Sequence, residues 1–318
     1  MEIENILSEN ITAAGSKADY DAACKRLLSN KIILAWIMKS CIEEYSSYEV
    51  YEIAGKYIEG TPQVSETAVN PDEGDLYGYV QGTATEDSTI TEGSVTYDIR
   101  FYAIIPGTEE KISLIINIEA QNDFYPGYPI IKRAIYYCSR MVSSQYGREF
   151  TNSHYEKIKK VYSVWICTKP PVYRQNTINR YTIHEENLAG DAREKKENYD
   201  LMAAIIICLG SPCKDRYSGI LKLLEVLLSS ERKPEEKKQI LKEDFNIKMT
   251  SELESEVALM CNLSKGIEEK GINQGIKEGI ITAIKNLMES MDWTEEQAME
   301  ALKIPEADKP LYSSMLER

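Results

Sequence analysis

Two stretches of alternating side chains, joined by a turn-forming segment, place the strongest constraint on how this chain folds. The stretches are Tyr97–Phe101 and Ile116–Gln121, and the intervening Pro106–Glu110 is rich in turn residues. Successive side chains of a strand point to opposite faces of the sheet. A hairpin centred between Thr108 and Glu109 therefore has one apolar face and one polar face.

In that register Asp98 lies directly opposite Glu119, and Gln121 shares their face. Directly opposed Cβ atoms lie about 4.5–5.5 Å apart, and two carboxylates at that distance repel each other unless a cation lies between them. We therefore expect a divalent-metal site with Asp98 and Glu119 as ligands and the Ala120 carbonyl as a further oxygen donor. The plainer alternative is a polar face in contact with water. The other face pairs only apolar residues: Tyr97 with Ala120, Ile99 with Ile118, Phe101 with Ile116, and Ala103 with Leu114.

Composition excludes several classes of protein. The net charge of -14 argues against a surface that generally attracts nucleic acid. Seven cysteines without a CxxC pair, and only two histidines, argue for reduced core cysteines and against a zinc site. Because no signal peptide and no membrane-length apolar run is visible, we expect a cytoplasmic protein without a membrane partner.

The charge is unevenly spread along the chain. Residues 124–180 contain ten basic and two acidic residues, whereas the acidic residues gather on both sides of this segment. A basic patch beside an acidic metal site would suit a phosphodiester substrate. A solvated helix face with scattered lysines explains the same pattern, and both interpretations remain open.

The order of the predicted elements indicates an α/β (α+β) fold with a mixed central sheet flanked by helices. The segment between residues 60 and 93 is expected to be mostly loop with at most a short strand. A helix is predicted over residues 20–45, a second short element over residues 48–57, and another helix from the break at residues 126–129 to about residue 147. Strands are predicted over residues 161–167 and 178–183.

Composition shifts after Gly190, so we predict a core domain over residues 1–190 and a helical C-terminal region over residues 191–318. A Gly-Ile repeat over residues 266–280 predicts a weak helix, with a poorly ordered tether as the alternative. As a helix, the repeat would line up glycine and isoleucine in a narrow stripe that suits close contact with a partner helix, either within one chain or in a homo-oligomer that forms through the C-terminal helices. Thr294–Gln297 forms a capping box ahead of a short helix that Pro305 ends. The other helices are predicted over residues 201–209, 217–228, 234–245 and 249–263.

The hairpin residues resemble a known family. Asp98 followed by Ile118-Glu119-Ala120-Gln121 resembles the signature of the PD-(D/E)xK nuclease superfamily. The nearest branch is the recombination-promoting nuclease and putative transposase family, in which the final lysine is usually glutamine. The similarity continues through the basic, tyrosine-containing segment 132–140 and the apolar segment 160–166, and it covers about residues 25–190.

This resemblance implies a restriction-endonuclease-like core and an Mg²⁺- or Mn²⁺-dependent DNA endonuclease, a hydrolase of phosphodiester bonds in recombination or mobile elements. It implies that Asp98 and Glu119 are metal ligands and that Gln121 completes the catalytic set in place of lysine, which leaves open how the attacking water is activated. A further acidic ligand is expected from an earlier segment. The candidates are Glu43, Glu44, Glu66, Glu86 and Glu92, with Glu92 and Glu66 preferred.

The same resemblance implies a role for the basic helix. Arg133 and Arg140 are seven residues apart, so they share one helix face with Tyr137 close by. We expect these three residues to contact DNA phosphates, the alternative being a solvated stripe over a buried tyrosine.

A second function belongs to a different class of protein. The acidic composition and the glutamine at position 121 also suit a non-catalytic module that keeps the nuclease fold and acts in binding or assembly through its C-terminal helices.

Overall fold

The computed structural model describes residues 19–60, 63–64, 86–89, 93–96, 98–108, 111–119, 124, 126–211, 218–229, 232–306 and 308–316. The chain divides into two compact units, a larger one that ends at Cys261 and a smaller one whose described residues begin at Asn262. The described strands and the candidate site all belong to the larger unit.

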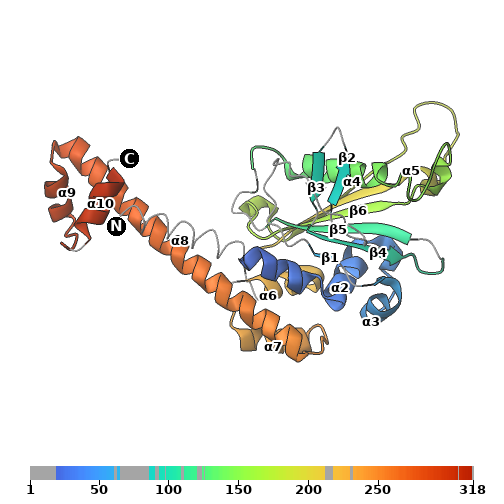
Figure 1. Cartoon of the computed structure of the whole chain (residues 1–318), viewed down its shortest axis with the longest axis horizontal. Coiled ribbons are helices and arrows are strands. Elements are labelled where there is room, and N and C mark those ends of the chain that lie inside the picture. The colour runs from blue at the N-terminus through green and yellow to red at the C-terminus, as the bar shows by residue number, and fades with distance from the viewer. Residues whose placement is uncertain are drawn as a thin grey trace. The chain divides into compact units, whose positions relative to one another are not determined.

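A mixed sheet forms the centre of the larger unit (Figure 1). In the described residues it has six strands in the order β1-β4-β5-β6-β8-β7. Strands β5, β6 and β8 run parallel, whereas β1, β4 and β7 run antiparallel to their neighbours. The predicted mixed sheet is therefore confirmed. The strands are β1 (Gln63–Val64), β4 (Ile99–Ile104), β5 (Lys111–Glu119), β6 (Val161–Cys167), β7 (Thr177–Thr182) and β8 (Met202–Cys208), and a separate pair comprises β2 (Glu86–Thr89) and β3 (Gly93–Thr96).

Helices cover both faces of this sheet. Helix α4 (Ile130–Ser143) connects the parallel strands β5 and β6 and packs on one face, while α2 (Lys31–Cys41) and α6 (Gly219–Leu228) lie on the other side (Figure 1). Strand β6 is buried along its whole length because both of its faces are covered. Short helical segments complete the unit: η3 (Tyr155–Lys157), η4 (Val172–Arg174) and α5 (Lys196–Tyr199).

The helix predicted over residues 20–45 is interrupted. Residues 19–28 form one helix, and a second helix, α2, begins after Asn30. The Asn30 side chain accepts a hydrogen bond from the Ile32 N–H at 3.0 Å, which caps α2 and stops the first helix from continuing. The chain then forms η1 (Glu43–Tyr45), α3 (Val50–Glu52) and η2 (Ile53–Tyr57), and the last two match the predicted element over residues 48–57.

The predicted hairpin is confirmed as β4 and β5, but its predicted register is wrong by two residues. Ile99 pairs with Ile116, whereas the predicted partner was Ile118. Because side chains alternate with a period of two, a shift of two residues does not move a side chain to the other face. Ile99, Phe101 and Ala103 are buried, as predicted for the apolar face, but each has a different partner.

The turn explains the shift in register. The Thr108 N–H donates a hydrogen bond to the Ile105 carbonyl at 3.1 Å, across Pro106 and a Gly107 with φ of +80°. Proline followed by glycine with positive φ is the pattern of a type II turn. This turn centres the hairpin one residue before the predicted centre, so that Ile104 pairs with Lys111.

The helix predicted over residues 201–209 is wrong, because this segment forms strand β8 between β6 and β7. A short, continuous apolar run fits a strand buried on both faces as well as it fits a buried helix. The predicted domain boundary at residue 190 is therefore also wrong, since the central sheet continues beyond it and the units divide after Cys261.

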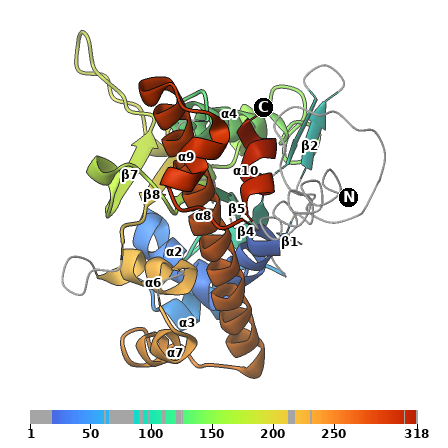
Figure 2. The ribbon, with the colours of Figure 1, turned by 90° about the vertical axis from the view of Figure 1, so that its left-hand side faces the viewer.

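The C-terminal helices are α7 (Pro234–Glu243), α8 (Ser251–Met291), α9 (Glu295–Ala301) and α10 (Lys309–Leu316). The Gly-Ile repeat lies within α8, which confirms the helix and not the tether. In the smaller unit α9 and α10 pack against the last turns of α8 (Figure 2), which confirms the predicted helical unit. Helix α9 ends at Ala301, earlier than predicted, because Lys303 adopts a φ of +55°.

Replacing Thr294 with alanine is expected to destabilise α9 by about 1 kcal/mol. The Thr294 hydroxyl accepts from the Gln297 N–H, and the Gln297 side chain accepts from the Thr294 N–H, so the substitution removes one half of the capping box. Hydrogen exchange of the α9 amides measures the effect. Thr282→Ala is the matched control, because the Thr282 hydroxyl only donates to a carbonyl inside α8. Equal protection of the α9 amides in both variants would contradict the prediction.

Candidate functional site

Asp98 lies at the start of β4, beside the end of β5, and only 6% of its surface is exposed. Its carboxylate contacts the ammonium group of Lys25, with Oδ1 2.9 Å from Nζ. Lys25 is 1% exposed and comes from the helix over residues 19–28. A charged pair this deeply buried is costly to form, so its presence at a strand end marks the region as a candidate site.

A second carboxylate shares the same ammonium group. Asp21, one helical turn before Lys25, places its Oδ2 2.7 Å from Nζ. Burial on its own would lower the pKa of Lys25, but the carboxylates of Asp98 and Asp21 outweigh it and raise the pKa above its ordinary value. Lys25 therefore remains charged and holds two carboxylates close together.

The predicted direct opposition of Asp98 and Glu119 is wrong. The pairing ends at Ile99 and Ile116, so Asp98 lies just before β4, next to Asn117 and two residues from Glu119 along β5. Glu119 is the last residue of β5 and pairs with Cys167 at the end of β6. The two candidate residues thus lie at the same end of the β4–β5 pair.

Several predicted site residues lie outside the described residues. These are Gln121, Ala120, Glu66 and Glu92 in full, and the side chain of Glu119. Within the part of the chain that the structure describes, no group of three or more His, Cys, Asp or Glu side chains could hold a metal ion.

Two of the other acidic candidates are engaged elsewhere. Glu44 accepts a hydrogen bond from the Tyr162 hydroxyl. Tyr162 lies at the beginning of β6, whereas Glu119 lies beside the end of β6, so Glu44 is at the opposite end of the strands from Glu119. Glu43 forms an ion pair with Lys196. Neither carboxylate lies where it could join Asp98.

Arg133 is held by aromatic side chains near the start of α4. Its Nε and Nη2 donate to the Tyr137 hydroxyl at 3.0 and 2.8 Å, and its Nη1 donates to the Tyr128 hydroxyl at 3.2 Å. Its guanidinium also lies 5.5 Å from the ring centre of Trp165. Tyr137 is buried, which raises its pKa although Arg133 opposes the shift. Tyr137 therefore fixes the arginine and is not itself a surface contact.

Arg140 shares a helix face with Tyr137, as predicted, but that face packs on the sheet. Only 4% of Arg140 is exposed. A contact with an external phosphate, predicted for Arg140, is therefore not available to it in this structure, and the same burial applies to Tyr137.

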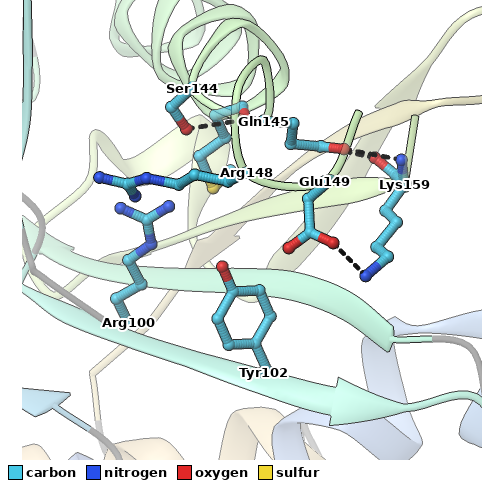
Figure 3. Close-up of a pocket in the computed structure, with 8 residues that line it drawn as sticks. Arg100, Tyr102, Ser144, Gln145, Arg148, Glu149 and Lys159 are labelled. Carbon is cyan, nitrogen blue, oxygen red and sulfur yellow. Dashed lines mark hydrogen bonds and ion pairs between the residues drawn. The ribbon is translucent and has the colours of Figure 1, made fainter. Parts of the chain in front are cut away.

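The pocket between β4 and the segment after α4 is not a ligand site. Figure 3 shows its lining, with Arg100 and Tyr102 on the strand and Arg148 and Gln145 across from them. Its volume is about 10 Å³, which is room for about one water molecule. Glu149 and Lys159 form an ion pair at its rim, so this part of the basic segment is already neutralised.

Ion pairs also neutralise positive charge elsewhere in the segment 124–180. Lys160 contacts Asp200 at 2.7 Å and Glu44 at 3.5 Å. The local excess of basic residues in the sequence is therefore larger than the excess of accessible positive charge.

The sequence analysis missed Lys25 and Asp21. The only local signal was their spacing of four residues, which places an acidic and a basic side chain on one helix face and is common on solvated helices. Their proximity to Asp98 depends on how the first helix packs against the sheet edge.

No protein family model, curated protein or solved structure matches this chain. Among the described residues, none lies in a helix with the length and apolar character needed to cross a membrane.

Proposed function

We propose that this protein is a cytoplasmic, metal-dependent DNA endonuclease that hydrolyses phosphodiester bonds in recombination or mobile-element biology. The observation that carries the proposal is the position of Asp98 and Glu119 at the same end of the β4–β5 pair, with the Lys25 ammonium in contact with Asp98. Carboxylates and a buried cation at the carboxyl ends of parallel strands are a common arrangement for an α/β active site.

The order of elements supports the resemblance to the PD-(D/E)xK superfamily and its restriction-endonuclease-like core. A helix precedes the β4–β5 hairpin, and α4 then leads to a strand parallel to β5. The resemblance implies a lysine two residues after Glu119, where this chain has Gln121. In the proposed site Lys25 replaces the lysine that the resemblance implies, and it stabilises negative charge beside Asp98.

The donor set fits Mg²⁺ or Mn²⁺, because both metals prefer carboxylate oxygens. Asp98 and Glu119 would hold the metal, and Asp21 joins Glu66 and Glu92 as a candidate for the further acidic ligand, because it already shares Lys25 with Asp98. When bound, the metal would lower the pKa of a water molecule and polarise the phosphate. Arg133, near the start of α4, would orient the phosphate with its guanidinium held by tyrosines.

Replacing Glu119 with glutamine is expected to lower Mg²⁺-dependent nicking of supercoiled plasmid by about a hundredfold or more, because it removes charge that acts on the developing transition state. Wild-type nicking should require Mg²⁺ or Mn²⁺ and stop in a chelator. Glu156→Gln is the matched control, since Glu156 is exposed in η3 at the other end of the sheet. Equal nicking by the Glu119 variant and wild type would refute the assignment.

One observation favours the second candidate, a non-catalytic binding or assembly module. Lys25 already neutralises Asp98 without a metal, so the pair is complete as a structural ion pair. Such a module would act through its C-terminal helices, with a homo-oligomer as one outcome. Calorimetric titration with Mn²⁺ separates the two functions, because only the nuclease predicts a binding site that is lost in Glu119→Gln.

A further inference from the structure

An arginine surrounded by aromatic rings lies where strand β6 ends. The Arg174 guanidinium is 6.0 Å from the ring centre of Phe124 and 5.8 Å from that of Tyr173. The side chains of Tyr181 and Tyr173 lie close enough to this guanidinium to raise its pKa. We call these four residues the aromatic cluster.

Much of the aromatic cluster is open to solvent. Tyr173 is 70% exposed and Tyr181 is 37% exposed. Single exposed apolar side chains are normal on a protein surface, but rings gathered around one cation form a surface that fits a planar partner.

The register places the start of β7, shortly after Tyr173 and Arg174, at the same end of the sheet as the candidate site. Glu119, Cys167 and Cys208 end the parallel strands side by side, and Thr177 of β7 pairs with Cys208. Tyr181 pairs with Ala204, so it lies four residues further along β7, on the same face as Thr177. Strand β7, the edge strand marked in Figure 2, lies three strand spacings from β5, or about 14 Å.

The charge of this region suits a polyanion. Residues 168–184 contain Lys169, Arg174 and Arg180 and no acidic residue. Arg180 faces the other side of β7, so Lys169 and Arg174 supply the charge nearest to the rings. Exposed rings with a cation match single-stranded nucleic acid, whose bases offer faces for stacking, whereas a duplex offers only its backbone and base edges.

We infer that the aromatic cluster is a stacking platform for unpaired bases, so that the DNA substrate carries a single-stranded segment a few nucleotides from the bond to be cut. This inference rests on the proposed nuclease function and adds the class of substrate. The 14 Å between the cluster and β5 corresponds to about four nucleotides of a stacked strand.

The test is binding of a fluorescent single-stranded oligothymidine, and of a duplex of equal length, to the full chain in a chelator. Tyr173→Leu is expected to weaken single-strand binding about 5- to 150-fold, because stacking on one ring is lost. Tyr173→Phe keeps the ring and loses only the hydroxyl, and should bind like wild type. Tyr155→Leu is the matched control. Tyr155 is 64% exposed, and it lies in η3 just before β6, at the opposite end of the parallel strands.

Three results would overturn the inference. One is unchanged single-strand binding by Tyr173→Leu, another is an equal loss of duplex binding, and the third is wild-type affinity no higher for the single strand than for the duplex. Because binding is measured without metal, it is independent of cleavage. If nicking is absent but binding depends on the Tyr173 ring, the nuclease assignment fails and the stacking surface stands.

Discussion

Replacing Lys25 with methionine is expected to lower the free energy of unfolding by about 3–5 kcal/mol. Methionine matches the length of the lysine stem, but it removes the ammonium group that contacts the buried carboxylate of Asp98. Asp21 would lose the same partner at less cost, because its side chain is 26% exposed and reaches water. Urea denaturation of the full chain, followed by a probe in the larger unit such as tryptophan fluorescence, measures the change.

The matched control is Lys56→Met. Lys56 also pairs with an acidic residue four positions away, Glu52 at 2.9 Å, but its side chain is 69% exposed, so the change should have little effect on the free energy of unfolding. If the two lysine variants are destabilised equally, the buried pair is not the cause. Lys25→Met combined with Asp98→Asn should be less destabilised than the two single changes together predict, because both report on one interaction.

The destabilisation by Lys25→Met should be the same at pH 7 and pH 9.5. The pKa of Lys25 is raised above the ordinary 10.5, so the stability that it contributes is present below pH 10.5 and is lost only as pH rises through the folded-state pKa. Denaturation curves at the two pH values provide the comparison. A destabilisation that falls between pH 7 and pH 9.5 would mean that the lysine loses its charge earlier than its carboxylate neighbours allow.

Replacing Arg232 with methionine is expected to have a similar effect, a loss of about 3–5 kcal/mol in the free energy of unfolding. The Arg232 Nε lies 3.0 Å from both carboxylate oxygens of Glu225, and the side chains are 9% and 3% exposed. Arg232 also pairs with Glu236 in α7, so it links α6 to α7. The substitution leaves the Glu225 charge buried among apolar neighbours of α6.

Lys238→Met is the control for this second pair. Lys238 contacts Glu254 at 3.0 Å, but both side chains are more than a third exposed, so the loss should stay below about 1 kcal/mol. Urea denaturation in the same buffer compares the two variants. A loss from Arg232→Met no larger than that from Lys238→Met would show that the Glu225 pair adds little to the stability of the helical layer.

The elements that depend on local pattern were predictable from the sequence. Strand β6, the hairpin faces, α4 and the Thr294 capping box follow from alternation, helical periodicity and side-chain hydrogen bonds to nearby backbone groups. The strand β8 was not predictable in this way, because a short apolar run has no period that distinguishes a buried strand from a buried helix. Its neighbours β6 and β7 decide its conformation.

The candidate site was likewise predictable from the sequence only in part. The sequence placed Asp98 and Glu119 at the same end of one hairpin, and a register shift of two residues leaves them there. The partner of Asp98 was not found, because Lys25 reaches it from a distant helix. The sequence by itself determined that these two candidate residues lie at one end of a hairpin, since alternating strands and the turn between them are local properties. Only the tertiary structure decided that Lys25 joins Asp98 and that Arg140 is buried, because both depend on how the helices pack on the sheet.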